Sequence, residues 1–230
     1  MAIYVTGDTH GDFGRFSYKK WHEARSLTKD DIVIIAGDCG LLWSNEPDEQ
    51  EHYWKLWLSK KPWTTAYVCG NHENHPRLQA LPTEQRYSGT VGVIAPNILH
   101  FRRGEIYEIQ SKKIFTFGGA NSIDKEGRTL GVSWWPEELP SYKETDYGLG
   151  NLEKHQYAVD FIIAHTAPQD VAEALTNTCG SHADDADPTR AYLQHVCSST
   201  AFSGLYCGHW HVDADLGRYH FLYERIVRIA

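Results

Sequence analysis

Five short runs of β-branched and aromatic residues in this chain each end in an aspartate, an asparagine or a histidine. Runs of this length and composition predict β-strands. In four of them a glycine precedes the polar residue, which lets the backbone turn tightly and leaves room for a ligand to approach. One such strand end has little predictive value, but five predict a common site. The strand ends are 3–6 before Gly7-Asp8, 31–36 before Gly37-Asp38, 65–69 before Gly70-Asn71, 159–164 before His165, and 203–207 before Gly208-His209.

The order of the predicted elements indicates an α/β fold. The first third reads strand, helix, strand, helix, strand, which implies parallel strands joined by crossovers. The first crossover helix is predicted over 13–27, and a second follows the capping residue Ser44 and ends near Lys61. We expect the apolar stripe of this second helix to belong to the core. Its members are Tyr53, Leu56 and Trp57.

The chain changes character from Thr90 onward, where short alternating strands are joined by turns. Helices are predicted after these strands, and the tail returns to antiparallel strands around Gly217 and Glu224. This order predicts two mixed sheets packed face to face, with helices outside. The later predicted strands are 98–101, 105–109, 113–117 and the segment 212–229, and the later predicted helices are 136–157, 168–175 and 188–196.

A single α/β domain over 1–230 is expected, because the chain has 230 residues and no linker or low-complexity tract divides it. The longest apolar run near the first motifs is the five residues 32–36, too few to span a bilayer. The sequence enters a strand almost at once and leaves no room for a signal peptide. We therefore expect a cytoplasmic location.

The five cysteines form no CxxC pair, so a disulfide framework is not expected. Cys69 and Cys207 close strand runs and are interpreted as small buried thiols. Cys39 adjoins Asp38 and is interpreted as part of the wall of the site rather than as a ligand.

The net charge of −8, from 30 acidic and 22 basic residues, disfavours binding to a long nucleic acid through its phosphates. A local basic patch remains compatible with this balance. Carboxylates gathered around cations would themselves contribute to the acidic excess.

The polar groups at the strand ends form a mixed carboxylate and imidazole set. Such a set suits Mn, Fe, Zn or Ni better than Ca or Mg, and Mn is the favoured ion. Seven ligands are too many for one tetrahedral zinc and match two ions that share a bridge, for which Asp38 is the natural carboxylate. Two ions roughly 3.5–4 Å apart activate a bridging water as hydroxide and clamp phosphoryl oxygens, which predicts hydrolysis of phosphate esters. The set comprises Asp8, His10, Asp38, Asn71, His165, His209 and His211.

In the order of these groups the chain resembles the calcineurin-like metallophosphoesterases. Their pattern is Asp-x-His, then Gly-Asp, then Gly-Asn-His-Asp/Glu, then His, then Gly-His-x-His. The resemblance covers residues 7 to 211, nearly the whole chain, and implies a four-layer α/β/β/α sandwich with two divalent metal ions. The matching segments are Asp8-Thr9-His10, Gly37-Asp38, Gly70 to Glu73, His165 and Gly208 to His211.

The same resemblance implies a role for each residue. Asp38 would be the catalytic bridge between the ions. His72 would face the substrate beside Asn71, either as a general acid or as a hydrogen-bond donor to the phosphate. One ion would take Asp8, His10, Asp38 and His211, and the other Asp38, Asn71, His165 and His209.

The second motif departs from that of the phosphoprotein phosphatases in this superfamily. Those enzymes continue with an Asp that orients the catalytic histidine and an Arg that grips phosphate, whereas this chain has Leu41 and Leu42. A serine/threonine protein phosphatase is therefore disfavoured. The candidates for the phosphate side are Asn121, Lys125 and Arg128, although a solvated basic loop is an equally open interpretation.

Other aromatic and histidine residues are open to two interpretations. Trp134 and Trp135 either stack on a nucleobase or pack against the next helix, and packing is favoured. His75 and His182 either support the site from outside the ligand set or belong to ordinary loops. The remaining histidines are expected on the surface or in ordinary hydrogen bonds: His22, His52, His100, His155, His195 and His220.

The leading hypothesis is a dinuclear phosphoesterase acting on mono- or diesters of a small molecule, with nucleotides among the candidates. A DNA or RNA nuclease of the same superfamily is the first alternative, although such relatives usually carry a capping region for which this chain has no spare length. A non-catalytic scaffold is the second, and the intact ligand set with His72 argues against it. The expected partner is a small-molecule phosphate ester, without a membrane or a long nucleic acid.

Overall fold

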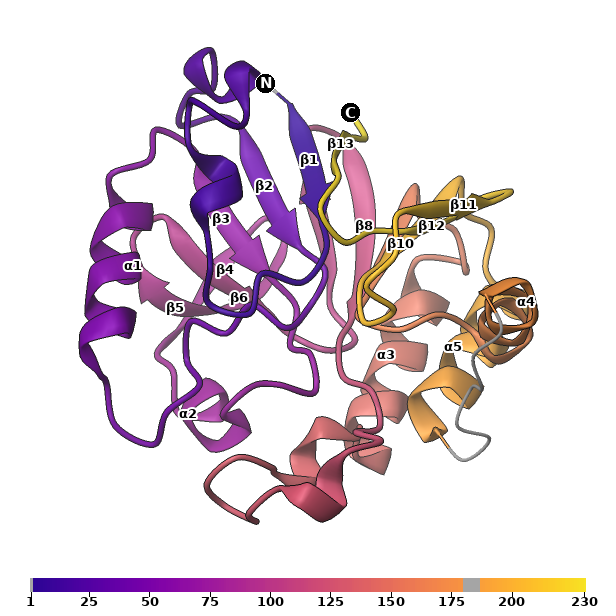
Figure 1. Cartoon of the computed structure of the whole chain (residues 1–230). Coiled ribbons are helices and arrows are strands. Elements are labelled where there is room, and N and C mark those ends of the chain that lie inside the picture. Colours follow the sequence, from indigo (N-terminus) through magenta and orange to yellow (C-terminus); the bar gives the residue numbers. More distant parts are fainter. Residues whose placement is uncertain (1, 180–186) are drawn as a thin grey trace.

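The computed structural model describes residues 2–179 and 187–230, and the strands in these ranges form two mixed sheets, as predicted (Figure 1). The first sheet contains the first three strands of the chain, and the second contains the later ones that end at His165 and Gly208. The order in the first is β13 (Ile226–Arg228), β1 (Ile3–Thr6), β2 (Ile32–Ile35), β3 (Thr64–Tyr67), β6 (Ile98–Phe101), β5 (Gly89–Ala95) and β4 (Thr83–Arg86). The order in the second is β11 (Ala214–Leu216), β12 (Tyr219–Phe221), β10 (Gly204–Cys207), β9 (Phe161–Ala164), β8 (Lys112–Phe117) and β7 (Ile106–Ile109).

Three clusters of buried apolar side chains separate four layers. The middle cluster joins the facing sides of the two sheets, for example Ile34 with Ile163. The second lies between the first sheet and α1 (Glu49–Ser59) with α2 (His75–Gln79). The third lies under α3 (Tyr142–Lys154), α4 (Gln169–Cys179) and α5 (Pro188–Ser199), on the outer side of the second sheet. The α/β/β/α sandwich expected from the sequence is confirmed (Figure 1).

Strand direction brings the motifs together. In the first sheet β1, β2 and β3 are parallel neighbours, so their carboxyl ends lie side by side. In the second sheet β9 and β10 are parallel neighbours as well. Strands such as β2 are buried on both faces, because the sandwich covers both sides of each sheet, and this explains their continuous apolar sequence.

The helix predicted over 13–27 is wrong. This segment forms two short 3₁₀ turns, Gly14–Phe16 and His22–Arg25, that are separated by an irregular link. The backbone N–H of Gly14 donates to Oδ1 of Asp12 at 2.8 Å, which starts a turn rather than a helix. The buried side chains of Phe16, Trp21 and Ala24 recur after five and then three residues, and each turn anchors its own part of the core.

The core face predicted for α1 is wrong at two of its three positions. Tyr53 and Leu56 are 59% and 58% exposed, whereas Trp57 is partly buried and packs against the apolar cluster as expected. The helix instead buries Leu58 and Glu51, and a charged residue can occupy this face because Arg77 contacts both carboxylate oxygens of Glu51 at 2.7 and 2.8 Å.

Several boundaries differ from the prediction. The single helix expected over 136–157 is a 3₁₀ turn at Pro136–Glu138 followed by α3, which begins at the capping box of Ser141 and Glu144. The polar edge strand β4 was not predicted, because it has no apolar alternation. In the tail, β12 runs parallel to β10, whereas its pairing with β11 is antiparallel as expected.

The cysteines that the structure describes are free and buried: Cys39, Cys69, Cys197 and Cys207. Among the described helices, none has both the length and the apolar content that crossing a membrane requires.

Candidate metal centre

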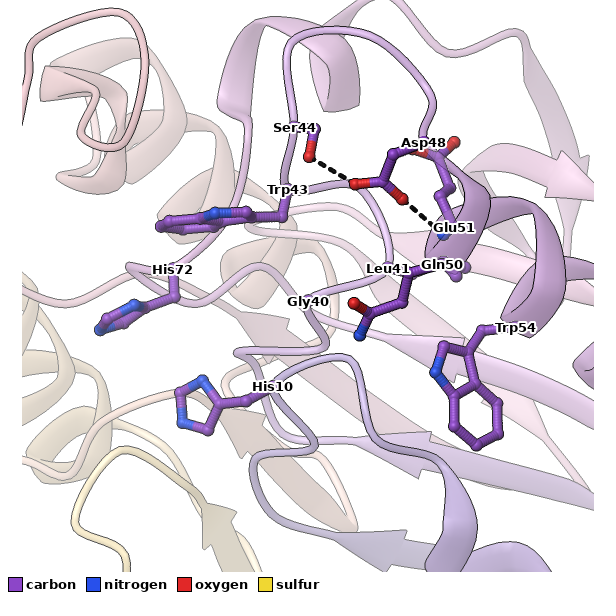
Figure 2. Close-up of a pocket in the computed structure, with 10 residues that line it drawn as sticks. All are labelled: His10, Gly40, Leu41, Trp43, Ser44, Asp48, Gln50, Glu51, Trp54 and His72. Atoms are coloured by element: carbon purple, nitrogen blue, oxygen red, sulfur yellow. Dashed lines mark hydrogen bonds between the residues drawn. The ribbon is translucent and has the colours of Figure 1, made fainter.

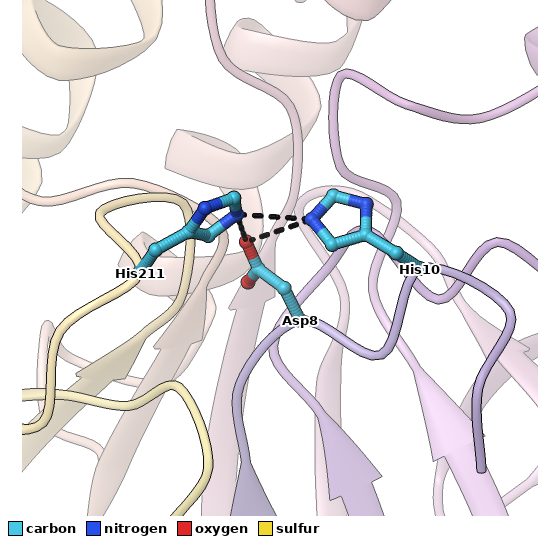
Figure 3. Close-up of side chains that lie close together, drawn as sticks. All are labelled: Asp8, His10 and His211. Carbon is cyan, nitrogen blue, oxygen red and sulfur yellow. Dashed lines mark hydrogen bonds and ion pairs between the residues drawn. The ribbon is translucent and has the colours of Figure 1, made fainter.

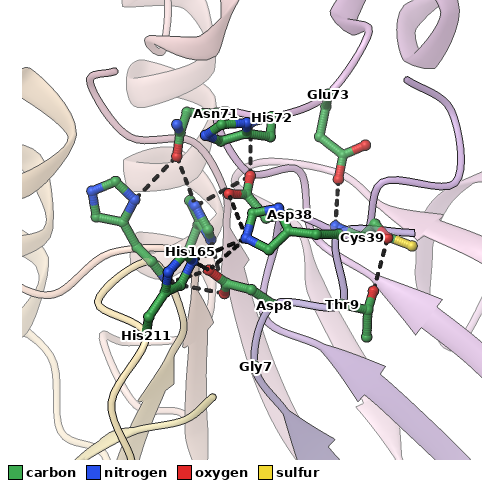
Figure 4. A network of polar contacts seen from close by, with 12 residues as sticks. Gly7, Asp8, Thr9, Asp38, Cys39, Asn71, His72, Glu73, His165 and His211 are labelled. Atoms are coloured by element: carbon green, nitrogen blue, oxygen red, sulfur yellow. Dashed lines mark hydrogen bonds and ion pairs between the residues drawn. The ribbon is translucent and has the colours of Figure 1, made fainter. Parts of the chain in front are cut away.

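The structure brings the seven predicted ligand residues together beyond the ends of β1, β2, β3, β9 and β10. Figure 4 shows Asp8, Asp38, Asn71, His165 and His211 of this set. The two carboxylates, Asp8 and Asp38, are 1% and 2% exposed and lie inside a shell of imidazole and amide groups. Buried carboxylates need partners of opposite charge or hydrogen-bond donors. Two groups of side-chain contacts stand out among these residues, and Asp38 approaches both. Asp8 also links the two, because its Oδ1 lies 4.0 Å from Nδ1 of His165.

The first group is Asp8, His10 and His211 (Figure 3). Oδ2 of Asp8 lies 3.0 Å from Nε2 of His211 and 3.8 Å from Nε2 of His10. The two imidazole nitrogens are themselves 2.9 Å apart. Three potential ligand atoms therefore point at one small volume, and a cation there would be bound by a carboxylate oxygen and two ring nitrogens.

The second group is Asn71, His165 and His209. Oδ1 of Asn71 lies 3.0 Å from Nε2 of His165 and 3.0 Å from Nδ1 of His209. The amide nitrogen of Asn71 donates to Oγ of Ser122 at 3.1 Å, and Ser122 donates to the fully buried Glu138 at 2.6 Å. This chain of hydrogen bonds turns the amide oxygen of Asn71 toward the two histidines.

Asp38 faces both groups with different oxygens. Its Oδ1 lies 3.4 Å from Nε2 of His165, and its Oδ2 lies 3.9 Å from Nε2 of His10. The backbone N–H of His72 donates to Oδ1 at 2.7 Å and fixes the rotation of the carboxylate. Each oxygen of Asp38 thus faces a different group of side chains.

The glycines of the motifs are required by close packing as well as by turning. A Cβ at Gly70 would collide with Oδ1 of Asp38, and one at Gly208 would collide with Oδ1 of Asp8. At Gly37 a Cβ would overlap the ring of His165. Each strand end thus approaches a site residue from another strand so closely that any larger side chain would displace it.

Four of the site residues have left-handed backbone conformations. The φ angles are 44° at His10, 46° at Asp38, 69° at His209 and 50° at His211. Such conformations are uncommon for residues other than glycine and cost on the order of 1–3 kcal/mol each. Their concentration here is typical of a functional site, because the rest of the fold must compensate for the strain.

The two carboxylates dominate the electrostatics of the centre. Burial raises the pKa of Asp38, but the opposing effect of His165, His72 and His10 is larger. The net result is a pKa well below the usual range of an aspartate. Burial lowers the pKa of His165, but Asp38 and Asp8 raise it to about 9. Burial lowers the pKa of His209 to about 3. The raised pKa of His165 means that a cation at Nε2 would compete with a proton for this nitrogen.

His72 stands at the edge of the centre between two residues that hold its ring. The indole of Trp43 stacks on it with ring centres 5.6 Å apart and planes inclined by 24°. Nη2 of Arg128 lies 2.6 Å from Nε2 and 3.1 Å from Nδ1 of His72, and Oδ2 of Asp124 accepts from the same Nη2 at 2.6 Å. Burial, Arg128 and His10 lower the pKa of His72, against the opposing effect of Asp38.

Of the residues expected on the phosphate side, Arg128 contacts His72 at the edge of the centre, whereas Lys125 contacts Asn121. Nζ of Lys125 donates to Oδ1 of Asn121 at 3.3 Å. The backbone N–H of Asn121 donates to Oδ2 of Asp187 at 3.2 Å. Leu41 is buried in the apolar cluster under the first sheet, so it has no polar role at His72.

Sequence reasoning missed residues that reach the site from distant segments. Trp43 and Asp124 have no motif of their own, and their roles depend on the contacts with His72 and Arg128. The ring of Tyr223 stacks on His211 with centres 4.8 Å apart. Proximity in sequence to a motif was the available signal for Trp43, and none existed for Tyr223.

The remaining predictions for aromatic and histidine residues have mixed outcomes. Trp135 is buried and contacts Trp43 edge to face, in keeping with a packing role. His75 and His100 are both buried and line a separate cavity of about 50 Å³, so the expectation of an exposed or ordinarily bonded His100 is wrong. His182 lies outside the described residues.

Comparison with known proteins places this geometry in a family. The family model of the calcineurin-like phosphoesterases matches residues 1–213. Lariat debranching enzyme A of Xenopus laevis is 26% identical over 176 residues, which cover 70% of this chain and 28% of that protein. The lariat debranching enzyme of Schizosaccharomyces pombe is 30% identical over 118 residues, or 50% of this chain and 24% of that protein. The matched segments are therefore about a quarter of the length of either relative. This chain belongs to the calcineurin-like phosphoesterase family.

Proposed function

We propose that this protein is a dinuclear metal-dependent hydrolase of phosphate mono- or diesters of a small molecule. The observation that carries the proposal is the placement of Asp38, whose two oxygens face His165 and His10 in separate groups. A carboxylate between two such groups is the arrangement that two-metal hydrolases need. Mn²⁺ is the ion that we favour for this donor set. A single domain over 1–230 and a cytoplasmic location stay predictions.

The donor set fits two divalent cations, one in each group. Bound ions would supply an activated water and would neutralise charge on the phosphoryl oxygens. The proposed ligands are Asp8, His10, Asp38 and His211 for one ion, and Asp38, Asn71, His165 and His209 for the other.

The protein's own residues then provide orientation and proton transfer. His72 is proposed to donate a proton or a hydrogen bond to the ester, with Asn71 next to it at the phosphate. Trp43 keeps the ring of His72 in one plane by stacking on it. Arg128 supplies a guanidinium close to the phosphoryl group, in the role that Leu42 cannot fill.

Replacing Arg128 with alanine is expected to raise KM for the physiological ester about 10-fold or more, because a guanidinium contact to phosphate is lost. Metal content should not change, since Arg128 contacts His72 and Asp124 and not the two ligand groups. Steady-state kinetics and metal analysis of Arg128→Ala and Arg128→Lys test this. Arg225→Ala, which removes a guanidinium from an exposed ion pair with Asp215, is the matched control. Unchanged kinetics in Arg128→Ala would remove Arg128 from the phosphate side.

A substrate panel tests the proposed function. Mn-loaded protein is assayed against phosphomonoesters, phosphodiesters, cyclic nucleotides and branched or linear RNA. We expect turnover of a small-molecule ester that is lost on chelation and restored by Mn²⁺. Preferential cleavage of RNA would favour the nuclease alternative, to which the similarity to lariat debranching enzymes points. Absence of turnover on every class would favour the non-catalytic scaffold.

A further inference from the structure

A cavity of about 250 Å³ opens directly beside His10 and His72 (Figure 2). This cavity is distinct from the two ligand groups, because most of its wall comes from the segment between β2 and α1 and from the first turns of α1. Its size is slightly below the range typical of drug-sized ligand sites, so it has room for one ring system with a small attachment. The residues that define its walls are Trp43, Leu41, Asp48, Gln50 and Trp54.

Two indoles give the cavity flat apolar walls. Trp43 is half-buried and already stacks on His72 at the end nearest the centre. Trp54 lies at the other end and is held from behind by an edge contact with Phe13, with ring centres 5.4 Å apart. Rings fixed in this way offer a stacking surface without a further loss of side-chain freedom on binding.

The polar groups of the cavity are mainly hydrogen-bond acceptors. Asp48 caps α1 by accepting from the backbone N–H of Glu51 at 2.8 Å, and it accepts from Ser44 Oγ at 2.8 Å. The backbone N–H of Gln50 also donates to Asp48, and these three donors still leave capacity on its carboxylate, which can accept about four hydrogen bonds. The backbone hydrogen bond from Glu51, followed by that from Ser44, lowers the pKa of Asp48 and keeps it ionised. Glu51 is neutralised by Arg77.

We infer that this cavity binds the leaving group of the substrate and that the group is a nucleoside. The inference rests on the proposed function, and three observations support it. His72, the proposed proton donor, lines the cavity. The part of the substrate that occupies the cavity is therefore the part that receives the proton and leaves. The indole walls fit a flat base. The acceptors Asp48 and Gln50 fit a base that carries N–H donors, of which guanine has the most on one edge.

The step balances simply. Water adds its oxygen to phosphorus, the bond from phosphorus to the nucleoside oxygen breaks, and that oxygen takes a proton from His72. His72 regains a proton from the attacking water by way of solvent. The products are a nucleoside and phosphate, or a phosphomonoester when the substrate is a diester.

The test compares guanosine 5′-monophosphate with ribose 5-phosphate, which share the same leaving oxygen and differ in the base alone. If the substrate panel shows that the protein hydrolyses diesters, the methyl diesters of these two compounds are used instead. We expect kcat/KM to be higher for the guanosine ester, and Trp54→Leu to reduce that advantage by about 5- to 150-fold, as expected for loss of a base-stacking ring. Gln50→Ala should also reduce the kcat/KM advantage of the guanosine ester, by a smaller factor. Tyr142→Leu, which removes an 81% exposed ring at the start of α3, should leave this advantage unchanged.

A binding measurement separates this inference from the proposed function. Guanosine, which has no phosphate to hydrolyse, is titrated by calorimetry into the wild-type protein, Trp54→Leu and Tyr142→Leu. Binding that weakens in Trp54→Leu and persists in Tyr142→Leu supports the cavity assignment, even if neither ester is hydrolysed. Hydrolysis of both esters with equal kcat/KM, unaffected by Trp54→Leu and Gln50→Ala, would overturn the nucleoside assignment and leave the phosphoesterase proposal intact. Failure of guanosine to bind the wild-type protein would also overturn it.

Discussion

Asp38→Asn is expected to lower kcat by at least about 10³-fold while the fold is retained. The amide has the shape of the carboxylate, so the hydrogen bond from the backbone N–H of His72 to Oδ1 can persist. The negative charge is lost, however, and one of the two ligand groups then faces an NH₂ group in place of an oxygen. Two cations cannot be held together by an amide with a single acceptor atom.

The Asp38→Asn experiment needs three readouts on one preparation: kcat, metal content per chain and thermal unfolding. Asp160→Asn is a matched control, because it makes the same chemical change at an ion pair with Lys112 on the second sheet. The control should retain both turnover and metal. If Asp38→Asn keeps two ions per chain and near-native turnover, Asp38 is not a bridge.

His72→Ala is expected to reduce kcat by a factor that depends on the leaving group. Positioned general acids typically contribute about 10²–10⁴-fold, and their contribution grows with the basicity of the departing oxygen. A p-nitrophenolate departs without a proton, whereas the alkoxide of a nucleoside does not. The loss should therefore be small for a p-nitrophenyl ester and close to the full range for a nucleoside ester.

The surroundings of His72 make this comparison informative. Trp43 and Arg128 both contact the ring, so it is held even though Leu41 stands where related phosphatases have an orienting Asp. Arg128 donates to Nε2, the nitrogen that would otherwise carry the proton, and entry of a phosphate is expected to draw the guanidinium away. kcat is measured for both esters with the wild-type protein and with His72→Ala, each at verified metal content. Equal losses on both esters would show that His72 binds phosphate or stabilises the transition state, and the acid role would be dropped.

The strand-end motifs could be predicted because they are local. A short apolar strand followed by Gly-Asp or Gly-His is specified by consecutive residues, and parallel neighbours such as β1 and β2 then place these ends together without further information. The glycines support this in physical terms, since a Cβ at Gly70 or Gly208 would overlap the carboxylate of Asp38 or Asp8.

The predictions that failed depended on contacts made elsewhere in the fold. The 13–27 segment has helix-like spacing over part of its length, but Phe16 and Trp21 are anchored by separate turns. In α1, the buried face was set by the ion pair between Glu51 and Arg77, which no periodicity reveals. Tyr223, which follows β12, stacks on His211, and Asp124 acts on the site by forming an ion pair with Arg128.

The most direct measurement is the number of Mn²⁺ ions bound by the wild-type protein at saturation, determined by equilibrium dialysis with elemental analysis. The two ligand groups, each of which faces one oxygen of Asp38, predict two ions per chain. The count should fall to one in His211→Ala, which depletes the first group, and to one in His165→Ala, which depletes the second. Saturation at a single ion in the wild-type protein, or an unchanged count of two in both variants, would contradict the dinuclear centre.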